Sequence, residues 1–155
     1  MLDRNDAIVK LLIAEEGWKT EPYKDSRGFW TIGVGHLIDS RQGGVIPTYV
    51  RSFPVSDPLV SRMLEEDINI KKVELSRMLP WTASLDLPRY NVFLSMAFQM
   101  GLPRLSGFRK MLAAAQNGDW VTAAVEGRDS PWRKVQTPAR AERLMQVLET
   151  GKEDV

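Results

Sequence analysis

Residues 15–36 read EEGWKTEPYKDSRGFWTIGVGH, and this stretch decides the fold. It begins where an amphipathic helical pattern over residues 6 to 16 ends, at Glu16 and a glycine that suits a helix stop. Aromatic and β-branched residues separated by glycines follow up to about residue 50, which is typical of short antiparallel strands with tight turns. The stretch therefore predicts a helix end followed by a small sheet whose first turn is Asp25-Ser26-Arg27-Gly28.

The rest of the chain is predicted to be mainly helical, after a loop over residues 51 to 57. Ser130 and Thr137 each precede a proline and are predicted to cap a helix start. The other predicted helices cover residues 58 to 79, 87 to 100, 107 to 117 and 119 to 127, and the last helix ends near residue 150. A local sheet followed by a block of helices gives an α+β fold class.

The composition excludes several kinds of site. The 155 residues fit one domain, and the absence of cysteine excludes disulfides and thiolate metal sites. A single histidine disfavours a histidine-based metal site, so no metal or cofactor is expected. The formal charge of +1 is too balanced for a nucleic-acid-binding protein, so no nucleic-acid partner is expected and a monomer is the default.

The first residues favour neither a signal peptide nor a transmembrane segment. They are acidic rather than basic, and the apolar run after them is broken by Lys10 and closed by Glu15 and Glu16.

Two carboxylates, Glu16 and Asp25, lie on separate predicted elements, and the hydroxyl of Thr31 follows on the next strand. Glycoside hydrolysis uses such a pair, in which one acid protonates the leaving oxygen and the other serves the water or the sugar. Glu16 lies at the negative end of the helix dipole, which is unfavourable to a carboxylate. This position therefore suits a residue that acts as a general acid. Glu15 is the competing acid, but the glycine that follows favours Glu16. Each residue also has a plainer interpretation, as a solvated helix end, a turn former and a strand former.

The order of these residues resembles a known family. Glu16-Gly17, Tyr23-Lys24-Asp25, Gly28 and the run Thr31-Ile32-Gly33-Val34-Gly35-His36 look like the phage-type lysozymes of the T-even class, glycoside hydrolase family 24. Residues 96–101, 119–124 and 132–140 extend the resemblance over most of the chain, whereas residues 38–55 depart from the T-even pattern and are shorter.

The resemblance implies one lysozyme domain over residues 1–155. It implies a lysozyme-like fold with a small antiparallel β lobe at about 17–57, a linking helix at 58–79 and a larger helical lobe made of 80–155 with 1–16. The implied reaction is hydrolysis of the β-1,4 bond between N-acetylmuramic acid and N-acetylglucosamine in the glycan strands of peptidoglycan, with inversion of configuration.

The resemblance also assigns catalytic and supporting roles. Glu16 matches the general acid, Asp25 the second carboxylate, and Thr31 the hydroxyl beside the attacking water. Structural support falls to three residues. His36 is expected to pair with Asp67, and Arg140 is expected to pair with the acid.

The resemblance also implies sugar contacts from both lobes. Amide side chains such as that of Gln99 suit the N-acetyl groups of the glycan. The residues expected to contact the glycan are Gly35, Leu37, Phe98 and Gln99, with Trp30 as a further candidate. Trp120 and Trp132 are expected in the helical core instead.

Three rival functions are weighed against hydrolysis. A lytic transglycosylase needs an acid but no second carboxylate, and a non-catalytic peptidoglycan-binding module would have lost the acid. The third rival function is nucleic-acid binding through a basic strip formed by Arg133, Lys134, Arg140 and Arg143.

The resemblance implies a phage or prophage endolysin with a role in host-cell lysis. Such an enzyme stays in the host cytoplasm until a holin-type partner releases it to the wall in the periplasm. Carriage in the virion is the alternative route.

Overall fold

The structure, a computed structural model, describes residues 1–39, 41, 43–44 and 54–153. It contains two compact units, Met1–Ile70 (unit 1) and Lys71–Val155 (unit 2). Helices predominate over a small antiparallel sheet, so the predicted α+β class is confirmed. In chain order the elements are α1 (Ala7–Glu16), β1 (Lys19–Lys24), β2 (Trp30–Gly33), β3 (His36–Leu37), α2 (Asp57–Met78), a 3-10 helix (Pro80–Ser84), α3 (Leu87–Met100), α4 (Leu102–Ser106), α5 (Arg109–Gln116), α6 (Trp120–Arg128), a π-helical turn (Trp132–Gln136) and α7 (Pro138–Thr150).

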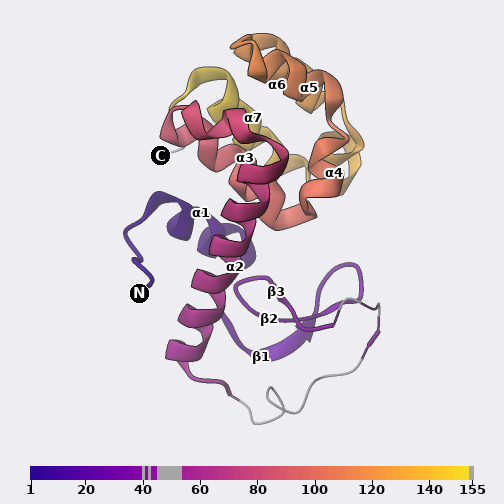
Figure 1. Cartoon of the computed structure of the whole chain (residues 1–155). Coiled ribbons are helices and arrows are strands. Elements are labelled where there is room, and N and C mark those ends of the chain that lie inside the picture. Colours follow the sequence, from indigo (N-terminus) through magenta and orange to yellow (C-terminus); the bar gives the residue numbers. More distant parts are fainter. Residues whose placement is uncertain (40, 42, 45–53, 154–155) are drawn as a thin grey trace. The chain divides into compact units, whose positions relative to one another are not determined.

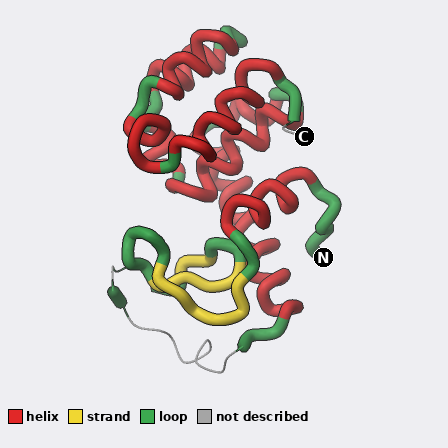
Figure 2. Tube along the Cα trace, turned by 180° about the vertical axis from the view of Figure 1, so that it is seen from behind, coloured by secondary structure: helices red, strands yellow, loops and turns green. Residues whose placement is uncertain are grey.

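Unit 1 contains a three-stranded sheet in the order β1-β2-β3, drawn in yellow in Figure 2. Tyr23 lies opposite Thr31, and Thr31 lies opposite Leu37. Residues directly opposite one another in antiparallel strands point to the same face. The side chains of Tyr23, Thr31 and Leu37 therefore form one row across the sheet.

The helices of unit 1 begin and end where their capping residues allow. The Asp6 carboxylate accepts a hydrogen bond from the Ile8 amide and caps α1, and Gly17, with φ +78°, ends it. The predicted helix over residues 6 to 16 is thus confirmed. The unit buries apolar side chains from both helices and the sheet, among them Ile8, Val9, Leu12, Ile32, Val34, Val60, Met63 and Leu64.

Unit 2 is formed around α3, whose residues 91 to 97 are all buried. Helix α3 packs against α7, and α6 packs between α5 and α7 (Figure 1). The predicted helix over 87–100 is confirmed, and Asp119 caps α6 by accepting a hydrogen bond from the Thr122 amide. The long predicted helix at 58–79 is α2, and the boundary between the two units falls within it.

Three details differ from the predictions. The helix predicted over 107–117 is α5 alone, and it is preceded by the unpredicted α4. Pro103 did not prevent α4, because a proline in a first helical turn removes no intrahelical hydrogen bond. The 3-10 helix was not predicted, and the helix that starts after Ser130 is a π-helical turn; each is five residues long, too short to show a hydrophobic period. The predicted cap at Ser130 is confirmed, since its hydroxyl accepts a hydrogen bond from the Arg133 amide over 3.3 Å.

Thr137 does precede α7, but its hydroxyl does not cap the helix; the hydroxyl oxygen accepts a hydrogen bond from Gln99. Residues 45–50 of the predicted sheet and residues 51–53 of the predicted loop lie outside the described residues. Residues 1–16 fall in the same unit as the sheet. Their grouping with the helical lobe stays a prediction.

Candidate functional site

Glu16 is the last residue of α1, and its side chain lies against Gly35. A Cβ atom added to Gly35 would lie 2.9 Å from Glu16 Oε2 and 3.0 Å from its Cδ. Gly35 also has φ +63°, a conformation that L side chains rarely adopt. A glycine is therefore required here twice over, by the backbone and by the carboxyl group that rests on it.

Asp25 follows β1 directly and is held by the hairpin turn that it opens. Its Oδ1 accepts hydrogen bonds from the amides of Arg27 and Phe29, each 2.9 Å long. Its own amide donates to the Phe29 carbonyl, and the Gly28 amide donates to the Asp25 carbonyl. The turn thus fixes one carboxylate oxygen, while Oδ2 takes no part in it.

Thr31 lies in β2 and is 4% exposed. Its hydroxyl donates to the Phe29 carbonyl over 3.0 Å. The single proton of the hydroxyl is used in this bond, so the oxygen offers its lone pairs to any further partner. Such an oxygen can accept a hydrogen bond from a water molecule.

Tyr23 is a further residue of this region, and the sequence pattern predicts no role for it. Burial raises the pKa of the Tyr23 phenol, and the negative charges of Glu16 and Asp25 raise this pKa further. Both carboxylates therefore act on one phenol, which lies opposite Thr31 in the sheet. Strand pairing places Thr31 opposite Tyr23, and Glu16 and Asp25 are the two charged groups that act on its phenol. Its role depends on strand register, which the sequence pattern alone did not specify.

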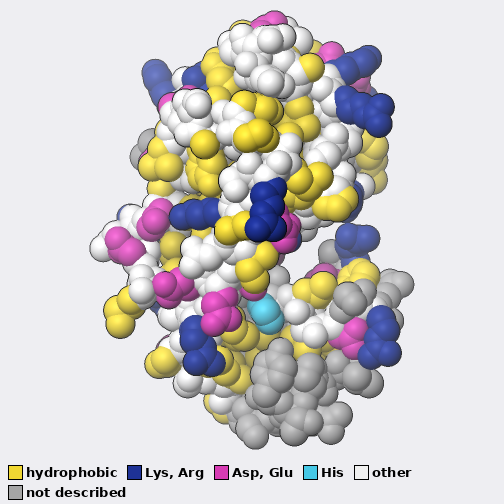
Figure 3. All heavy atoms as spheres, in the orientation of Figure 1, with side chains coloured by type: hydrophobic (Ala, Val, Ile, Leu, Met, Phe, Trp, Pro, Cys, Tyr) yellow, Lys and Arg dark blue, Asp and Glu magenta, His cyan; other side chains and the backbone are white. Residues whose placement is uncertain are grey.

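His36 and Asp67 are in contact within unit 1. The ring Nδ1 of His36 donates to Asp67 Oδ2 over 2.6 Å, and the two side chains are 24% and 22% exposed. The hydrogen bond to Asp67 raises the pKa of His36, although burial acts in the opposite direction. His36 is visible as the cyan atoms in Figure 3. The pair joins β3 to α2, as expected for a supporting contact.

The other two candidates for glycan contact in unit 1 are accessible to different degrees. Leu37 in β3 is 48% exposed. Trp30 lies opposite Lys24, whose Nζ is 5.3 Å from the centre of the indole ring. A sugar stacking on that face would share it with the ammonium group.

The remaining predicted residues lie in unit 2. Phe98 and Gln99 are partly buried in the last turn of α3, and Arg140 is 8% exposed in the first turn of α7. The Gln99 amide is hydrogen-bonded at both ends. Its Oε1 accepts from the Trp132 indole over 3.2 Å, and its Nε2 donates to Thr137 Oγ1 over 3.1 Å.

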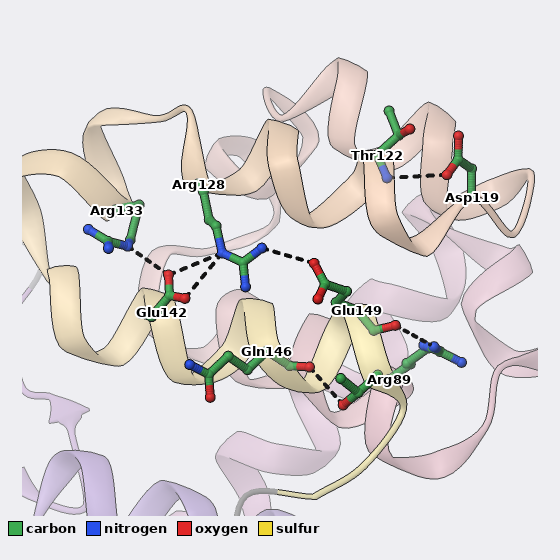
Figure 4. Close-up of polar contacts among 9 residues, drawn as sticks. Arg89, Asp119, Thr122, Arg128, Arg133, Glu142, Gln146 and Glu149 are labelled. Carbon is green, nitrogen blue, oxygen red and sulfur yellow. Dashed lines mark hydrogen bonds and ion pairs between the residues drawn. The ribbon is translucent and has the colours of Figure 1, made fainter.

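The predicted basic strip is largely taken up by partners on the chain. Arg133 Nε donates to Glu142 over 2.9 Å, and Arg128 binds both oxygens of the same carboxylate (Figure 4). Arg133, then Arg128, lowers the pKa of Glu142 against the effect of burial. Lys134 pairs with Asp129. Such internally paired cations are unfavourable for binding phosphates, and Figure 3 shows both signs of charge interspersed.

Trp132 is 2% exposed, which confirms its predicted place in the core, and it packs edge to face on Phe108. Across the described ranges of the chain, no three metal-binding side chains come together. Within the same described residues, every helix is too short or too polar to cross a membrane.

Comparisons with known proteins identify the family. The family model described as phage lysozyme matches residues 14–147. Two proteins of Dictyostelium discoideum, Probable T4-type lysozyme 2 and Probable T4-type lysozyme 1, are 34% and 31% identical over 162 residues, which cover 94% of this chain and 95% of each relative. The Pre-baseplate central spike protein Gp5 of Enterobacteria phage T4 is 30% identical over 163 residues, which cover 95% of this chain but 28% of that protein.

The matched range includes Glu16, Asp25 and Thr31, and the relatives extend over nearly the whole chain. With these matches, the chain belongs to the phage lysozyme family and is a glycoside hydrolase of the lysozyme type.

Proposed function

We propose that the protein hydrolyses the β-1,4 bond between N-acetylmuramic acid and N-acetylglucosamine in bacterial peptidoglycan. The observation that carries the proposal is that unit 1 holds Glu16 against Gly35, Asp25 in the turn after β1 and the buried hydroxyl of Thr31 in β2. Two carboxylates near one buried hydroxyl supply the groups that hydrolysis of a glycoside needs.

In the proposed reaction, Glu16 acts as the general acid and donates its proton to the glycosidic oxygen as the bond to the anomeric carbon breaks. A water molecule attacks that carbon and gives its proton to Asp25, whose Oδ2 is not used by the turn. Thr31 Oγ1 accepts a hydrogen bond from the second O–H of this water, since its own proton is donated to the Phe29 carbonyl. Attack on the face opposite the leaving group inverts the anomeric configuration.

Other groups support this chemistry in the proposal. Arg140 is assigned a supporting role, and His36 with Asp67 holds β3 against α2. Gly35, Leu37 and Phe98 contact the glycan strand. The carboxyl group of Glu16 rests on Gly35, so a sugar at Gly35 would lie beside the proton donor.

We propose that the protein works as a monomer on the cell wall and takes part in host-cell lysis. A holin-type partner would release it from the host cytoplasm to the periplasm. The baseplate spike relative supports carriage in a virion as the second route. Lysis in host cells with and without a co-expressed holin distinguishes the two routes.

The proposed reaction is tested by digesting purified peptidoglycan in water enriched in oxygen-18. Hydrolysis leaves muropeptides with a reducing end that carries the heavy isotope. Proton NMR of the first-formed anomer then reports inversion or retention. Products with a 1,6-anhydro end and no heavy oxygen would instead identify a lytic transglycosylase and contradict the proposal.

A further inference from the structure

Three side chains of unit 2 form a hydrogen-bonded relay, Trp132–Gln99–Thr137. The indole N–H of Trp132 donates to Gln99 Oε1 over 3.2 Å, and Gln99 Nε2 donates to Thr137 Oγ1 over 3.1 Å. The residues lie on three different segments, the last turn of α3, the π-helical turn and the residue before α7. Gln99 therefore links the end of one helix to the start of another.

The chemistry of Trp132 fixes the orientation of the Gln99 amide. An indole N–H can only donate, so the carbonyl oxygen of Gln99 must face Trp132 and its amino group must face Thr137. Trp132 is 2% exposed and packs edge to face on Phe108, with ring centres 5.8 Å apart. A buried donor of this kind is costly to leave without its acceptor. Turning Gln99 toward a sugar would break this bond.

The relay ends where α7 begins. The Thr137 amide donates to the Trp132 carbonyl over 3.0 Å and closes the π-helical turn. Arg104 Nη2 donates to Gln136 Oε1 and ties the same turn to α4. Arg140 lies in the first turn of α7 and is buried, so the point at which α7 starts decides where its guanidinium lies. Turns of π-helix occur frequently at functional sites.

We propose that Gln99 is a positioning residue for the start of α7, and through it for Arg140, and that it does not read the glycan. The proposal rests on the proposed function, in which Arg140 supports the acid. The two roles considered for Gln99, sugar binding and positioning, differ in their kinetic effects. A residue that binds the sugar affects KM, whereas a residue that orients a catalytic support affects kcat.

The kinetic test uses Gln99→Met, Trp132→Phe and the pair Thr137→Val and Thr137→Ser, with Gln146→Met as a matched control on the exposed face of α7. On soluble glycan strands, we expect kcat to fall about 10-fold in the first three variants, with KM within about twofold of the wild type. The pH profile of kcat should also move. Thr137→Ser keeps the hydroxyl and should restore the rate, and the control should match the wild type.

A second measurement tests the hydrogen bonds of the relay through stability and does not depend on enzymatic activity. The free energy of urea unfolding is measured for Gln99→Met, Trp132→Phe and the double variant. The double variant should lose less unfolding free energy than the sum of the two single variants, because either change breaks the same Trp132–Gln99 hydrogen bond. If the wild type proves inactive on peptidoglycan, the proposed function fails while this cycle still tests the relay.

Two results would overturn the proposal. One is a rise in KM with unchanged kcat for Gln99→Met, with wild-type kinetics for Trp132→Phe and Thr137→Val, which would make Gln99 a glycan contact. The other is strict additivity of the two unfolding losses, which would mean that Gln99 and Trp132 are not coupled.

Discussion

The two units hold their polar groups in different ways. In unit 1, the candidate catalytic groups are fixed by near neighbours in sequence, since Asp25 binds amides two and four residues away and Thr31 binds a carbonyl two residues away. In unit 2, the contacts of the candidate residue Gln99 join distant segments. Gln99 meets Trp132 and Thr137, 33 and 38 residues away.

This difference separates two tasks. A tight turn and a hairpin can hold a carboxylate with few residues, and they leave part of it accessible for chemistry. A block of helices has no such turn at its centre, so its buried polar side chains form hydrogen bonds with one another across the core. We therefore expect the largest losses of activity from changes beside the carboxylates of unit 1, and losses of stability with smaller losses of rate from changes in unit 2.

The largest effect is expected from Gly35→Ala. The new methyl group would collide with the Glu16 carboxylate and would be strained at φ +63°. Activity on peptidoglycan should fall about 100-fold, because a displaced acid no longer meets the glycosidic oxygen. Gly118→Ala is the control, since Gly118 also has a positive φ but no described atom lies within 4 Å of its added Cβ. Equal activity losses in the two variants would mean that strain alone, not contact with Glu16, explains the effect.

The next effect concerns the end of α7, which Arg89 holds (Figure 4). Its guanidinium donates to the carbonyls of Leu148 and Glu149, over 2.8 and 3.0 Å, and stacks on Trp120. Arg89→Ala should lower the free energy of unfolding by about 2–4 kcal/mol, measured by urea denaturation, with little change in KM.

Arg62→Ala is the matched control for Arg89, because Arg62 makes an exposed ion pair with Glu66 at 4.0 Å. Such surface pairs contribute less than about 1 kcal/mol. A comparable loss in both variants would contradict the special role of Arg89.

A smaller effect is the pH dependence of the His36–Asp67 pair. The pKa of His36 is raised in the folded protein, so its contribution to stability is fully present below the unfolded value of about 6.5 and is lost as pH rises through the folded pKa. Asp67→Asn should cost about 1–3 kcal/mol at about pH 5.5 and less at about pH 9. Urea unfolding at both pH values measures this. A loss of unfolding free energy in Asp67→Asn that grows with pH would contradict the predicted direction.

The smallest expected effect is a shift in the titration of Tyr23. Its pKa should fall in Glu16→Gln and in Asp25→Asn, because each change removes a negative charge that raises it. The ultraviolet absorbance of tyrosinate follows the titration, and Tyr→Phe variants assign the signals. Tyr90 is the control, since burial alone raises its pKa. An unchanged Tyr23 titration in both variants would mean that the carboxylates do not surround this phenol.

The same contrast explains how much could be predicted from the sequence. The helix end at Glu16, the turn at Asp25 and the strand position of Thr31 depend on local spacing, and the predicted elements at these positions agree with the structure. The resemblance to T-even lysozymes rested on the same local motif, and the family is confirmed.

The unpredicted features depend on long-range contacts. The row of Tyr23, Thr31 and Leu37 requires the strand register, which spacing alone leaves open. The hydroxyl of Thr137 looked like a helix cap, but Gln99, from a distant helix, donates a hydrogen bond to it. The basic strip looked like an open cationic surface, but Glu142 and Asp129 pair with its members.

The central claim is that Glu16 donates the proton that breaks the glycosidic bond. The most direct measurement compares wild type, Glu16→Gln and Glu15→Gln on purified peptidoglycan, with mass analysis of the released muropeptides. Both side-chain changes are isosteric, and the two positions are adjacent, so folding effects are matched. We predict reducing-end muropeptides from the wild type and from Glu15→Gln, and almost none from Glu16→Gln. Wild-type release by Glu16→Gln would contradict the account.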